Sequence, residues 1–172
     1  MFHTEATKLE VVPKVKVRWK GVLVWNDLYR KMKWLLDSLG YGDERSNFKE
    51  IKYLERIKGD SKNLEIHWIG ARSLNPYMLA TIEITFLVVA LKDVEMEKEG
   101  RKLKLNSADI DMRFNADLYI NNDGRFKKGS MLQKLNDEFL MKSRIEEWKI
   151  FTYSKLYLVH DEVKTMLNLL NY

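Results

Sequence analysis

The chain has 172 residues, of which 45% are hydrophobic and 32% are charged, and its formal net charge is +5. A chain of this length and composition fits one globular domain rather than a disordered segment. It contains no cysteine, which excludes disulfides, thiolate metal sites and cysteine nucleophiles.

The N-terminal residues 1–20 contain no apolar segment typical of a secretory signal. The most apolar run, 78–91, is shorter than a bilayer crossing requires and contains Glu83. We therefore expect a cytoplasmic protein with no membrane partner.

Neither an internal repeat nor a Gly/Ser linker divides the chain, so we expect one domain, 1–172, with residues 1–13 as an N-terminal arm.

The first regular pattern begins after Pro13, where cations alternate with apolar residues from Lys14 onward. This alternation predicts a half-buried strand over 14–24. The period then changes, and apolar residues at helical spacing predict a helix over 25–39. Gly40 followed by Tyr41 is typical of a helix stop.

The middle of the chain alternates apolar and polar residues, with turn residues between the alternating segments. Turns are expected at 59–63 and 73–76, and a separate hairpin over 94–105 is expected to turn at 99–100. These turns are too short for crossover helices, so neighbouring strands between 48 and 120 should be antiparallel.

The last part of the chain returns to helical spacing. Leu132, Leu135 and Phe139 share a stripe that predicts a short helix, and a longer stripe predicts a helix over 143–170. The stretch 150–157 is rich in β-branched and aromatic residues, so a break in that helix is an alternative. Together the elements predict an α+β fold in which a curved, antiparallel sheet of about six strands is covered by the two long helices.

This order of elements resembles the START-like, polyketide-cyclase-like helix-grip superfamily, and the match extends over most of the chain. The resemblance implies an apolar ligand held between the sheet and the last helix. Three departures are visible: one clear helix follows the first strand where two short ones are usual, an additional helix precedes the last, and a Gly-rich loop between early strands is missing. The resemblance concerns element order, so it carries over no functional residues.

The leading functional expectation is a non-catalytic binding or interaction domain with an apolar cavity between the sheet and the C-terminal helix. No cofactor is expected, and the expected partner is an apolar small molecule, with a homo-oligomer as an open alternative. Aromatic and methionine side chains on apolar stripes serve core packing as readily as a cavity wall. The candidate cavity residues are Met112, Phe114, Trp148 and Met166.

A second expectation concerns the basic face of the first strand, formed by Lys14, Lys16, Arg18 and Lys20. Such a stripe, about 20 Å long, could follow a phosphate backbone, as in a nucleic-acid or nucleoprotein accessory domain. The simpler interpretation is that lysines on an edge strand prevent edge-to-edge association. Edge protection is the favoured interpretation, because no aromatic residues interleave with the cations on that face.

A third expectation is a small enzyme built around His67, with Glu65 and Glu83 as carboxylate partners. A histidine beside carboxylates is the minimum for general-base chemistry. No serine or threonine nucleophile has a recognisable motif beside it, so a surface histidine is the favoured interpretation.

Three carboxylates, Asp109, Asp111 and Asp117, alternate on one face of the last expected strand, with Arg113 between them. Adjacent carboxylates could bind a hard cation or act as an acid/base pair, but a solvated charged face explains them as well. No spacing typical of metal ligands occurs, so we predict no metal site.

Overall fold

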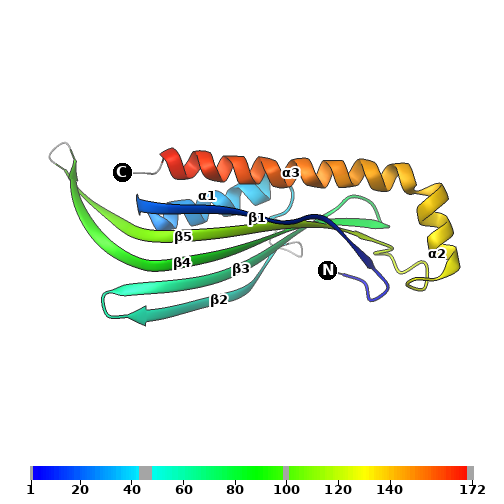
Figure 1. The fold of residues 1–172 in the computed structure, drawn as a ribbon, viewed down its shortest axis with the longest axis horizontal. Coiled ribbons are helices and arrows are strands. Elements are labelled where there is room, and N and C mark those ends of the chain that lie inside the picture. Colours follow the sequence, from blue (N-terminus) through cyan, green and yellow to red (C-terminus); the bar gives the residue numbers. More distant parts are fainter. Residues whose placement is uncertain (1, 43–47, 99–100, 170–172) are drawn as a thin grey trace.

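A computed structural model describes residues 2–42, 48–98 and 101–169 of the chain. It is an α+β fold with one antiparallel, five-stranded sheet in the order β1-β5-β4-β3-β2. Both long helices lie on the same face of this elongated, curved sheet (Figure 1). In chain order the elements are β1 (Thr7–Leu23), α1 (Trp25–Ser38), β2 (Phe48–Lys58), β3 (Ser61–Ser73), β4 (Met78–Lys98), β5 (Arg101–Ile120), α2 (Met131–Leu135), η1 (Asn136–Leu140) and α3 (Lys142–Leu169).

Strand β1 begins at Thr7, so most of the segment expected to be an arm is part of the sheet. It pairs with β5 from Thr7 opposite Ile120 to Leu23 opposite Asn106. Two register shifts lie between residues 10 and 15, on either side of Val12. Pro13 is tolerated there because β1 is an edge strand and proline lacks the N–H that a regular ladder needs.

Strands β4 and β5 each run through the segment expected to form a separate hairpin, which is why the sheet has five strands rather than about six. A register shift between Val89 and Lys92 keeps the ladder continuous, and Ala90 has a φ of 53° there. A bulge bends a strand without ending it. The turn expected at 99–100 lies outside the described residues.

Helix α1 has the expected start and stop. The side-chain oxygen of Asn106 accepts a hydrogen bond from the Trp25 backbone N–H at 3.0 Å. At the other end, Gly40 has a φ of +79°, and the Tyr41 N–H donates to the Leu36 carbonyl at 2.8 Å. This Schellman arrangement satisfies carbonyls that the last turn would leave unpaired.

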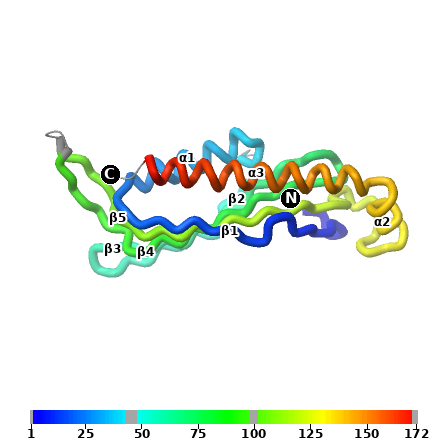
Figure 2. Tube along the Cα trace, turned by 45° about the horizontal axis from the view of Figure 1, so that its top comes forward, coloured from blue at the N-terminus to red at the C-terminus, as the bar shows by residue number. Residues whose placement is uncertain are grey.

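Helix α3 is continuous through 150–157, and no strand interrupts it. Its 28 residues span about 42 Å, which lets it run along most of the sheet (Figure 2). A buried stripe holds it against the sheet, and burial of this stripe outweighs the β propensity of the segment. The buried residues are Ile145, Thr152, Leu156, Val159, His160, Val163 and Leu167.

The core lies between the sheet and the two helices, and its apolar residues form one continuous cluster. An aromatic group anchors α1 to it: the rings of Trp68 and Phe86 are 4.7 Å apart, and Trp25 meets Phe86 edge-on at 6.2 Å. The indole N–H of Trp68 donates to Glu50 at 2.8 Å, and the Tyr29 hydroxyl donates to the same carboxylate. The opposite sheet face carries many polar residues, among them Glu83, Asp111 and Arg113.

Candidate functional site: a cavity beside the C-terminal helix

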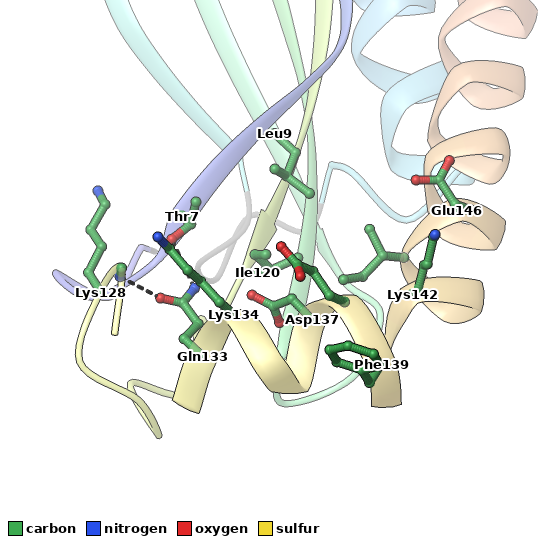
Figure 3. Close-up of a pocket in the computed structure, with 13 residues that line it drawn as sticks. Thr7, Leu9, Ile120, Lys128, Gln133, Lys134, Asp137, Phe139, Lys142 and Glu146 are labelled. Atoms are coloured by element: carbon green, nitrogen blue, oxygen red, sulfur yellow. Dashed lines mark hydrogen bonds between the residues drawn. The ribbon is translucent and has the colours of Figure 1, made fainter. Parts of the chain in front are cut away.

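A cavity that is open to solvent lies where the ends of β1 and β5 meet the start of α3, and it has a volume of about 800 Å³. The chain bends there from α2 through η1 into α3, and we call the segment Met131–Leu140 the elbow (Figures 2 and 3). Strand β1, strand β5, the elbow and α3 all contribute to the wall. The lining residues are Thr7, Leu9, Ile120, Lys128, Gly129, Gln133, Lys134, Asp137, Glu138, Phe139, Lys142, Ile145 and Glu146.

The loop that leads from β5 into the elbow is organised by Asn121, which is fully buried. Its amide N–H₂ donates to the Glu5 and Phe126 carbonyls at 3.0 and 2.7 Å, and its oxygen accepts from the Phe126 N–H at 3.0 Å. Asn121 has a φ of 58°, a conformation that asparagine tolerates better than most residues. One side chain therefore ties the loop to the N-terminal segment.

The elbow is fastened to β1 by Gln133, whose side chain is directed into the protein. Its amide oxygen accepts from the Gly129 N–H at 2.7 Å, and its N–H₂ donates to the Thr7 hydroxyl at 3.0 Å (Figure 3). The Ser130 hydroxyl accepts from the Gln133 N–H at 3.2 Å and caps the helix start. The sequence Ser130-x-x-Gln133 is typical of a capping box, but here the glutamine oxygen binds the Gly129 N–H rather than that of Ser130, and its N–H₂ reaches a distant strand.

A second fastening joins the elbow to the start of β4. The Tyr77 hydroxyl donates to Asp137 at 2.5 Å, and Tyr77 itself is almost fully buried. Burial, together with this hydrogen bond to a carboxylate, raises the pKa of the Tyr77 phenol above its ordinary value. The phenol thus remains a donor, and Asp137 keeps its position at the cavity edge.

The cavity combines an apolar floor with charged groups at its rim. Leu9, Ile120 and Ile145 supply apolar surface from three different elements. Lys134 and Lys142 stand at the rim, and neither forms an ion pair with another residue in the described part of the chain. Such a site suits a molecule with an apolar body and a polar end.

The four cavity candidates named from the sequence lie elsewhere along the sheet and α3, and the thirteen lining residues include none of them. Met112 and Phe114 are fully buried in the core, and the Phe114 ring meets the His160 ring edge-on at 6.0 Å. Trp148 and Met166 are partly buried against the same core. The middle of the helix–sheet interface is therefore packed, and the cavity opens at its end.

The basic face of β1 lies on the polar side of the sheet, at an edge. The structure places acidic residues of β5 beside it: Arg18 contacts Asp111 at 3.1 Å, and Lys20 is opposite Asp109. Lys16 is opposite Arg113, and Lys14 is exposed. The stripe is thus flanked by carboxylates along part of its length.

The acidic residues of β5 differ in their surroundings. Burial acts to raise the pKa of Asp111, but hydrogen bonds from Arg113 and Arg18 outweigh it, so the pKa is lowered. Asp117 is almost fully buried beside the Lys8 ammonium at 2.8 Å. Burial raises the pKa of the Asp117 carboxyl although the Lys8 charge acts in the opposite direction. Each aspartate thus has a cationic neighbour.

The His67 group lies on the same polar face. The His67 Nε2 is 3.5 Å from a Glu83 oxygen, whereas Glu65 pairs with Lys52 at 2.6 Å. The structure brings the histidine to one of its two expected carboxylates and gives the other a lysine partner. In the described ranges no cluster of three or more histidine and carboxylate side chains could hold a metal ion.

Comparisons with known proteins give no family for this chain. No family model and no curated protein matches it. Among solved structures, it is similar to an uncharacterised protein from Rhizobium leguminosarum, with 8% sequence identity, a TM-score of 0.20, and coverage of 92% of this chain and 99% of that one. A likeness of this size carries no functional argument.

Sequence reasoning missed Gln133 and Asp137, the two residues that fasten the elbow. The capping signal of Ser130 and Gln133 was available locally. The partners Thr7 and Tyr77 are 126 and 60 residues away along the chain, and no local pattern indicates such contacts.

Proposed function

We propose that this protein is a non-catalytic binding domain that holds an apolar or amphipathic small molecule in the cavity beside the elbow. The single observation that carries the proposal is the cavity itself. Its volume of about 800 Å³ lies within the range of about 300–1,000 Å³ that is usual for small-molecule sites.

The chemistry of the lining favours binding over catalysis. The lining side chains include no histidine, and the Thr7 hydroxyl is engaged with Gln133. The remaining polar groups are lysines and carboxylates at the rim, which orient a polar end of a ligand through hydrogen bonds and charge.

The first test is a binding titration with the fluorescent probe 1-anilinonaphthalene-8-sulfonate, together with native mass spectrometry of the purified protein. We expect saturable binding of the probe and a co-purified small molecule. Leu9→Trp places a large side chain in the cavity, so we expect probe affinity to fall by about tenfold or more.

The matched control is Leu158→Trp, which adds the same bulk on α3 at a residue that is 41% exposed and does not line the cavity. This control should bind the probe as the parent protein does. Equal affinity in the Leu9→Trp variant and the parent, or no saturable binding in the parent, would contradict the proposal.

A further inference from the structure

The elbow differs from an ordinary surface helix, because two of its polar side chains, Gln133 and Asp137, are directed toward the protein while its large apolar side chains are exposed. Gln133 is only 3% exposed, and its amide is hydrogen-bonded to Gly129 and Thr7. Asp137 is held by the Tyr77 hydroxyl. Polar groups therefore fix the orientation of this segment, and they turn its apolar face outward.

The outward face carries large apolar side chains in close succession. The exposed residues are Met131 at 77%, Leu132 at 68%, Leu135 at 44%, Phe139 at 75% and Leu140 at 76%. Single exposed apolar residues are ordinary, but a contiguous group on one short segment marks an interaction surface. The elbow itself lies at one end of the elongated molecule (Figures 1 and 2).

The charge around the elbow indicates what the partner is. Residues 127–144 contain five basic and two acidic residues, a net charge of +3 in a chain whose total is +5. One of the two acids, Asp137, is already engaged by Tyr77. The five cations are all exposed, and they are Lys127, Lys128, Lys134, Lys142 and Arg144.

We propose that the elbow docks this protein on the surface of a negatively charged lipid bilayer, with its apolar side chains inserted among the lipids and the flanking cations against the phosphates. Exposed apolar residues on a short helix flanked by lysine and arginine are the features that bind such surfaces. A second copy of the chain fits less well, because two such segments would bring like charges together.

Surface docking is compatible with the length and composition of the helices. Across the described stretches of the chain, no helix is long and apolar enough to cross a bilayer. The docking proposal departs from the sequence-based expectation of no membrane partner, and the experiment below decides between the two. The docking surface shares Phe139 and three cations with the cavity wall, but the side chains of Met131 and Leu132 do not line the cavity, so variants at these two residues test docking separately from ligand binding.

The test is co-sedimentation of the whole protein with vesicles of phosphatidylcholine alone or with about 30% phosphatidylserine. We expect binding only to the anionic vesicles, and weaker binding when salt rises from about 0.1 M to about 0.5 M, because salt screens the cations. The double variant Met131→Ser/Leu132→Ser should lose about tenfold or more of the vesicle affinity. Its thermal melt and its binding of the naphthalene probe should be unchanged.

The matched control is Ile150→Ser/Leu169→Ser, which removes two α3 side chains that are 69% and 78% exposed. We expect this control to bind the vesicles as the parent does. Absence of binding to anionic vesicles, equal binding to neutral ones, or equal losses in the two double variants would overturn the proposal. The proposal would also be overturned if the parent formed a dimer and did not bind vesicles, and if Met131→Ser/Leu132→Ser dissociated that dimer. This result would assign the surface to a second copy of the chain.

Discussion

Replacing Phe114 with alanine tests whether the middle of the helix–sheet interface is packed core. Phe114 is fully buried on β5, its ring lies against His160 of α3, and it does not line the cavity. Truncating a buried phenylalanine removes its burial and leaves a void, at a cost of about 3–5 kcal/mol in the free energy of unfolding. Phe139 offers a matched comparison, because it is 75% exposed, and Phe139→Ala should change that free energy by no more than about 0.5 kcal/mol.

The assay is equilibrium urea unfolding of the parent and both variants, followed by far-UV circular dichroism. If the unfolding free energy falls by about 2 kcal/mol per molar urea, a loss of about 4 kcal/mol in stability lowers the urea concentration at the unfolding midpoint by about 2 M. Phe139→Ala should leave the midpoint nearly unchanged. A loss below about 1 kcal/mol for Phe114→Ala, or similar losses for both variants, would refute the assignment of the cavity to the end of the interface rather than its middle.

Two further predictions concern the polar face of the sheet. Burial raises the folded-state pKa of Asp117, so the folded protein holds the Asp117 proton more tightly than the unfolded chain does. The stability that this proton contributes is fully present below the ordinary aspartate pKa, and it is lost as pH rises through the folded-state pKa. An asparagine cannot ionise, so the unfolding free energy of Asp117→Asn minus that of the parent should increase with pH over this range. Urea unfolding at several pH values measures this difference. A decrease with pH would show that the ion pair with Lys8 dominates. For the basic face, we expect no measurable binding to duplex or single-stranded DNA at physiological salt, because β5 places carboxylates such as Asp111 beside Arg18. An anisotropy titration showing tight, steeply salt-dependent binding that Lys16→Glu/Arg18→Glu abolishes would contradict this.

Local patterns predicted much of the fold, because they record the period at which side chains are buried. The alternation after Pro13 and the helical spacing that begins at Trp25 are confirmed, as is the helix stop at Gly40. The antiparallel arrangement followed from turns too short for crossovers, and it is confirmed for every strand pair described. The long last helix is confirmed as well.

Tertiary contacts decided what periodicity leaves open, namely which partner covers a face and which side of a helix turns inward. Residues 7–13 joined the sheet because β5, more than 100 positions later in the chain, supplies their ladder. The stripe of Leu132, Leu135 and Phe139 indicated a shared face but not its direction. Gln133 and Asp137 turned that face outward, because their hydrogen bonds to Thr7 and Tyr77 fix the opposite side of the elbow against the sheet. The cavity exists for the same reason: polar contacts between distant segments hold the elbow against the ends of β1 and β5, and a sequence read locally does not contain them.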